Sequence, residues 1–174
     1  MTFTHSGGSE IQTTFSLNIQ QNVLCDILIV GGGGGGGNPD GSSQEPGGGG
    51  AGGVVYMINK TLNAGTYKIN VGKGGASNAN GNNSSIEGNG IIIRAAGGGG
   101  GGQYNADSAP TPPSVTYTNP LTNTIVTSQG GGGGVRFNSI PYVFDSSLSG
   151  IGGINTDNNA ETGGAGGGAA PNIL

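Results

Sequence analysis

The sequence has few of the residues that build catalytic or metal sites. Among its 174 residues there is one cysteine (Cys25), one histidine (His5) and no tryptophan. A single cysteine excludes an internal disulfide and a multi-thiolate metal centre. One histidine leaves little material for a zinc site or a Ser-His-Asp triad. We therefore expect no catalytic residues, no cofactor and no enzymatic activity.

Charge is scarce as well. Lysine and arginine together number five against nine acidic residues, which gives a net charge of −4. No basic stripe exists for phosphate backbones, so nucleic-acid binding is not expected. The apolar runs are too short to cross a membrane. The first ten residues, MTFTHSGGSE, lack the basic and apolar regions of a secretory signal.

Helix signals are almost absent, whereas short strand signals are frequent. TTFSLNI (13–19) alternates apolar and polar residues, and VLCDILIV (23–30) is an apolar run interrupted by Asp26. We expect Asp26 to face solvent or to cap a neighbouring backbone amide. The strands fall roughly in residues 13–30, 54–71, 90–96 and 115–145. This pattern predicts a single all-β domain over 1–174, a small sandwich or jelly-roll-like set of strands.

Glycine supplies 42 residues, and most of them are concentrated in blocks. The blocks are 31–37, 47–53, 97–102, 130–134 and 163–168. At least three of them directly follow a predicted strand, which resembles an irregular internal repeat. Gly31, Gly33 and Gly36 satisfy the G-x-G-x-x-G pattern of dinucleotide-binding turns. However, the following NPDGSSQEP cannot open the helix that would hold a pyrophosphate, so we reject a nucleotide site.

A structural role for the blocks fits better. Polyglycine can form an extended helix with three residues per turn, whose amides and carbonyls point sideways to neighbouring rods. A seven-residue block would span ~22 Å, about the length of a six-residue strand. We therefore predict a packed bundle of polyglycine II helices, in which a single Gly→Val substitution in the middle of block 31–37 or 97–102 abolishes soluble folding. The structural glycines assigned to it are Gly31, Gly33, Gly36, Gly49, Gly99, Gly132 and Gly166.

Two polar stretches between the predicted rods have the composition of recognition loops. They are SNANGNNSS (77–85) and QYNADSAPTPPSVTYTNP (103–120), and the alternative is that they only reverse the chain. The candidate recognition residues are Asn80, Asn82, Tyr104 and Tyr117. A third stretch, NTDNNAE (155–161), alternates oxygen ligands without a complete calcium-loop pattern. It is interpreted as a solvated turn, with a metal site as the alternative, formed by Asn155, Asp157, Asn159 and Glu161.

Three segments carry a resemblance to known proteins: CDILIVGGGGGGG, PGGGGAGGVVYMINKTLNAGTYKINVGKGG and IIIRAAGGGGGG. They resemble the glycine-rich domain of predicted structural proteins of large algal and environmental viruses. The strand-plus-glycine pattern is more distantly similar to the glycine-rich domain of anaplastic lymphoma kinase receptors. It is also similar to tail-fibre tip adhesins of T-even-like phages. These resemblances imply β-strands attached to polyglycine helices, used for binding and not for catalysis.

The resemblance to viral proteins sets the functional expectation. It implies a non-enzymatic virion component, such as a minor capsid, cap or fibre protein, that assembles with other structural proteins or with copies of itself. The alternative is an adhesin or receptor-binding tip module, whose loops bind a host glycan or protein. We expect the protein in the assembled particle, without membrane insertion.

Overall fold

The computed structural model describes residues 1–37, 47–102, 111, 113–118, 123 and 125–131. Within these ranges it contains β-strands and no helix, so nothing described could span a membrane as a helix. The all-β prediction is confirmed. The strands are β1 (Gln12–Ile19), β2 (Val23–Val30), β3 (Val54–Leu62), β4 (Gly65–Gly72), β5 (Ser84–Gly88), β6 (Ile91–Ala95), β7 (Ser114–Thr118) and β8 (Ile125–Gln129).

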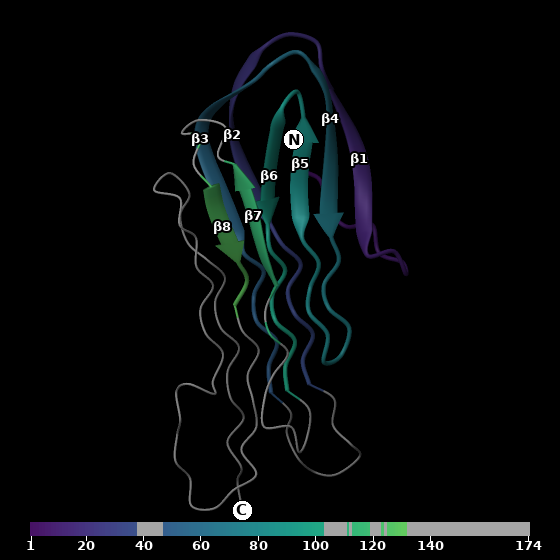
Figure 1. Ribbon diagram of the computed structural model, residues 1–174. Helices are drawn as coiled ribbons and strands as arrows, with labels where there is room; N and C mark the ends of the chain where they lie inside the picture. The colour runs from purple at the N-terminus through teal and green to yellow at the C-terminus, as the bar shows by residue number, and fades with distance from the viewer. Residues whose placement is uncertain (38–46, 103–110, 112, 119–122, 124, 132–174) are drawn as a thin grey trace, which may run out of the picture.

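The strands form three antiparallel sheets. The largest has four strands in the order β1-β4-β5-β6, and two further pairs are β2-β3 and β7-β8. The β5–β6 hairpin turns through Asn89 and Gly90, whose φ angles are 47° and 76°. A two-residue turn with both φ angles positive matches the twist of the strands that it joins. Figure 1 shows the strands running roughly side by side in the upper half of the molecule.

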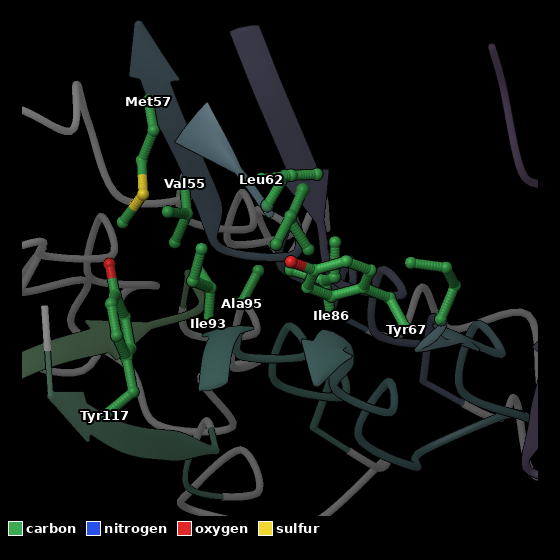
Figure 2. Close-up of a cluster of buried hydrophobic side chains, with 10 residues drawn as sticks. Val55, Met57, Leu62, Tyr67, Ile86, Ile93, Ala95 and Tyr117 are labelled. Atoms are coloured by element: carbon green, nitrogen blue, oxygen red, sulfur yellow. The ribbon is translucent and has the colours of Figure 1, made fainter. Parts of the chain in front are cut away.

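One hydrophobic cluster joins the three sheets. Val55 and Ile93 are fully buried, and Met57 and Tyr67 are 1% exposed. Figure 2 shows side chains of β3, β4, β5, β6 and β7 converging on this cluster. The Tyr67 hydroxyl donates to the Asn63 carbonyl at 2.9 Å, so the buried phenol is hydrogen-bonded. The apolar core therefore lies among the strands.

The sequence-based prediction did not include strand β5, but it gave the correct role for the Asp26 carboxylate. β5 carries a single large apolar residue, Ile86, and its first two residues had been assigned to a recognition loop. Ser84 and Ser85 are nevertheless buried. Asp26 is exposed at a register shift of β2, and its carboxylate accepts the Asn59 amide at 2.8 Å, as expected of a backbone cap. The predicted strand over 135–145 lies outside the described residues.

The glycine blocks lie together at one end of the molecule. Residues 31–37, 47–53 and 97–102 continue directly from or into β2, β3 and β6, and they extend from the same end of the strands (Figure 1). Residues 73–83, between β4 and β5, extend to the same side. The strands therefore fix where each glycine segment begins. We call residues 31–37, 47–53, 73–83, 97–102 and 130–131 the glycine region.

Candidate functional site

The glycine region is held together by backbone hydrogen bonds that recur at every third residue. Residues 31–37 run antiparallel to 47–53, and the amide-to-carbonyl bonds are Gly31 to Gly53 (2.9 Å), Gly34 to Gly50 (2.8 Å) and Gly37 to Gly47 (2.8 Å). Residues 31–37 also run antiparallel to 79–82, with bonds from Gly32 to Asn82 (2.9 Å) and Gly35 to Ala79 (3.0 Å). Residues in a β-ladder alternate with a period of two. The three-residue period therefore distinguishes these contacts from a sheet.

The carbonyls of the same segment are used in the same way by two parallel neighbours. Gly33 and Gly36 accept from Gly75 and Asn78, each at 2.8 Å. Gly32 and Gly35 accept from Gly98 at 2.9 Å and from Gly101 at 2.8 Å. Residues 31–37 are thus bonded to two antiparallel and two parallel segments. This segment is a hub that joins parts of the chain far apart in sequence.

Every residue of 97–102 is buried, which makes its backbone polar groups costly to leave unpaired. Its first five amides all have acceptors, and two of these are side chains. The Gly97 amide donates to Asn83 Oδ1 and the Gly100 amide to Asn80 Oδ1, each at 2.9 Å. The other three bonds are Gly98 to Gly32 (2.9 Å), Gly99 to Gly131 (2.8 Å) and Gly101 to Gly35 (2.8 Å). Two asparagines spaced three residues apart thus replace carbonyls of a neighbouring segment.

Close approach of backbones explains why these positions are glycine. A Cβ atom added at Gly31, Gly34, Gly49 or Gly98 would lie closer than 3.0 Å to a backbone carbonyl of another segment. At Gly33 and Gly36 the nearest atoms are the Gly50 oxygen at 3.7 Å and the Gly47 oxygen at 4.0 Å, which are ordinary contacts. Positive φ angles occur among the described glycines at Gly7, Gly8, Gly65, Gly88 and Gly90, all outside the glycine region. The region therefore needs glycine for space and not for left-handed backbone.

The structural glycines predicted from sequence differ in how much space surrounds them. Gly31 and Gly49 lie where a Cβ would clash, and Gly99 both donates to Gly131 and accepts from Gly50 at 2.8 Å. Gly33 and Gly36 are exposed and have room for a methyl group, although their carbonyls accept hydrogen bonds. Gly132 and Gly166 lie outside the described residues.

The candidate recognition residues are placed within the fold. Asn80 Nδ2 donates to the Thr111 carbonyl at 2.8 Å while its Oδ1 caps Gly100. The Asn82 backbone binds Gly32 and Lys73, each at 2.9 Å, and Tyr117 is 5% exposed in β7. Tyr104 and the possible metal ligands Asn155, Asp157, Asn159 and Glu161 lie outside the described residues. Asn83 was not among the candidates predicted from the sequence, and its three-residue spacing from Asn80 is the signal that could have identified it.

Reactive side chains are isolated in the described part of the chain. No cluster of three His, Cys, Asp or Glu residues gathers there to hold a metal. His5 Nδ1 lies 2.9 Å from the Thr13 hydroxyl. Burial, with a smaller contribution from the Asp26 carboxylate, raises the pKa of the Cys25 thiol. The neutral thiol is therefore favoured, which is the unreactive form.

An open groove of about 380 Å³ lies between β6 and the β7–β8 pair. Ile92, Arg94, Thr116, Thr118 and Ile125 contribute to its lining. The Arg94 guanidinium is paired with the Glu87 carboxylate at 3.4 Å. The groove therefore does not present an unpaired cation to a ligand.

Comparison with known families is consistent with the glycine region as the defining feature of the chain. The model of a family described as a glycine-rich domain matches residues 9–173. The chain belongs to this glycine-rich domain family. No curated protein and no solved structure matches the chain. Because no matched protein suggests a function, the function of this glycine-rich domain is inferred from the backbone contacts of the glycine region.

Proposed function

We propose that this glycine-rich domain is a non-enzymatic structural protein whose glycine segments form a packed bundle of polyglycine II helices. The three-residue hydrogen-bond period carries the proposal, because that helix has three residues per turn and no internal hydrogen bonds. Its amides and carbonyls must then bind neighbouring helices. Parallel and antiparallel neighbours of residues 31–37 both support this interpretation.

Such a bundle is stabilised mainly by its backbone, because glycine contributes no side chain to a core. Ordering each residue costs about 1–2 kcal/mol of backbone entropy, and glycine loses the most. Backbone hydrogen bonds and close dispersion contacts must offset that cost here, since glycine has no side chain to bury. The strands complement this arrangement by anchoring the ends of the segments next to an apolar core. A stiff spacer or mounting element is the role that this construction suits.

We further propose that the protein is built into a virion as a minor capsid, cap or fibre protein. This step is supported by the resemblance of residues 25–37, 46–75 and 91–102 to glycine-rich structural proteins of large viruses. It also agrees with the internal hydrogen bonds of the Asn80 side chain, which accepts from the Gly100 amide and donates to the Thr111 carbonyl.

Quantitative mass spectrometry of purified particles tests the proposed location. A structural component is expected at a fixed ratio to the main shell protein in independent preparations, and labelled antibody should decorate repeated positions. Absence from washed particles would contradict the proposal. The adhesin alternative would gain support if the protein were sparse and distal and if free protein blocked attachment to host cells.

A further inference from the structure

β1 forms an edge of the four-stranded sheet, and within the described residues no other strand pairs with it on its outer side. The N-terminal segment contacts β1 through its side chains, since the Ser6 amide donates to the Thr13 hydroxyl at 3.0 Å. Figure 1 shows β1 at the outer margin of the sheet, with β4 on its inner side. It pairs with β4 over eight consecutive residues, from Gln12↔Gly72 to Ile19↔Gly65, without a register shift. The strand is therefore long, regular and open on one side.

The register shows which backbone groups face the open side. The Lys73 amide donates to the Ile11 carbonyl at 3.0 Å, which makes Ile11 and Lys73 a hydrogen-bonded pair. Hydrogen-bonded and non-hydrogen-bonded pairs alternate along an antiparallel ladder, so the odd-numbered residues of β1 bond to β4. The Gly72 amide instead bonds the Ser84 hydroxyl on the β5 side at 3.0 Å, which gives the same alternation. The amides and carbonyls of Thr14, Ser16 and Asn18 therefore point outward from the sheet edge.

Exposed edges in soluble proteins are usually protected by charge, proline or a bulge. β1 has none of these, since its sequence is QTTFSLNI and its pairing is regular. By contrast, the edge formed by β2 carries Asp26 at a register shift. Leu17 and Ile19 are only partly buried although they pack against the core, and so is Phe15, whose ring also contacts Phe3 with the centroids 5.3 Å apart. A neighbouring strand on the outer side would cover them further.

We propose that β1 pairs antiparallel with β1 of a second copy of this chain, about a two-fold axis at Ser16. The geometry brings Ser16 opposite Ser16 and Thr14 opposite Asn18, so all three outward residues gain hydrogen bonds. On the core face Phe15 lies opposite the partner's Leu17, an apolar pair of the kind that stabilises sheets. A second copy suits this edge because β1 is uncharged, although each chain has a net charge of −4. The two four-stranded sheets become one continuous sheet.

Sedimentation equilibrium and light scattering of the full chain test the pairing. Wild-type protein should have twice the 16.8 kDa mass of one chain. Asn18→Lys places a charge on the edge and should yield monomers with an unchanged circular dichroism spectrum. Thr66→Lys is the matched control, because Thr66 is exposed on the same face directly beside Asn18 but on β4, one strand inside the edge. It should remain dimeric.

Cross-linking tests the register separately. Hydrogen-bonded antiparallel residues have Cα atoms about 5.5 Å apart, within the disulfide range of about 4.4–6.8 Å. In a Cys25→Ser background, Ser16→Cys should therefore form a covalent dimer on oxidation, whereas Thr66→Cys should not. A monomeric wild-type chain, an Asn18→Lys variant that stays dimeric, or no cross-link at Ser16→Cys would overturn the proposal. None of these results would bear on the glycine bundle, which is tested through the glycine substitutions described below.

Discussion

Gly34→Ala and Gly33→Ala should have opposite effects on stability, although the two residues are adjacent in one glycine block. The Cβ at residue 34 would overlap the carbonyl of Gly99, whereas at residue 33 it would lie 3.7 Å from the Gly50 oxygen. Gly34 also donates to Gly50, and Gly50 in turn donates to Gly99, each at 2.8 Å. An alanine at residue 34 would push its segment away from residues 97–102, which would strain or break both hydrogen bonds.

The expected magnitudes follow from those contacts. Each buried backbone group left unpaired costs about 1–3 kcal/mol, and overpacking costs a further ~1–3 kcal/mol. The smaller backbone entropy of unfolded alanine offsets about 0.4–1 kcal/mol. We therefore expect Gly34→Ala to lose about 3 kcal/mol or more, and Gly33→Ala to gain up to about 1 kcal/mol by the same entropy effect. At roughly 2–4 °C per kcal/mol for a chain of this size, Gly34→Ala should lower the Tm by about 6–12 °C.

Thermal and urea unfolding monitored by circular dichroism would measure both variants under identical conditions. Gly36→Ala provides a second permissive position, three residues further along the segment, where the nearest atom is 4.0 Å from the added Cβ. The reasoning would be refuted if the alanine at 33 or 36 were as damaging as the alanine at 34, or if all three variants melted like wild type.

Three other predictions concern single contacts. Asn83→Ala should lower the free energy of unfolding by about 1–3 kcal/mol because it leaves the buried Gly97 amide without its acceptor. Asn82→Ala should cost less, since within the described residues its side chain makes only a long hydrogen bond of 3.4 Å to the Lys73 carbonyl. Urea denaturation would compare the two variants, and equal losses would contradict the assignment. Tyr67→Phe should cost about 1 kcal/mol through loss of the bond to the Asn63 carbonyl, and an unchanged urea midpoint would refute it. Cys25 should react with iodoacetamide at pH 8 more slowly than in the urea-unfolded chain, because its pKa is raised in the folded state and less thiolate is present; a faster reaction would contradict that direction.

The strands could largely be predicted from sequence because their side chains carry the signal. Alternation in residues 13–19 and the apolar run in 23–30 correspond to β1 and β2. β5 could not be found in this way, because its buried serines are stabilised by hydrogen bonds and not by apolar burial. The Ser85 hydroxyl lies 2.9 Å from Asn70 Nδ2, and the Ser84 hydroxyl accepts the Gly72 amide.

The glycine region was less predictable for a different reason. The blocks were evident in the sequence, but a run of identical residues carries no information about which members contact a neighbour. Gly33 differs from Gly34 because of where residues 50 and 99 lie, and those contacts depend on segments far away in the chain. The bond between Asn80 Oδ1 and the Gly100 amide could not be predicted for a similar reason, because Gly100 is distant in the sequence.

Amide hydrogen exchange of residues 31–37, resolved by NMR, tests the central claim most directly. The amides of Gly31, Gly32, Gly34, Gly35 and Gly37 each donate to another glycine-region segment. No described residue accepts from Gly33 or Gly36, and both are exposed. The account predicts slow exchange at the first five and fast exchange at residues 33 and 36, a period of three. Uniformly fast exchange, or protection alternating with a period of two, would contradict it.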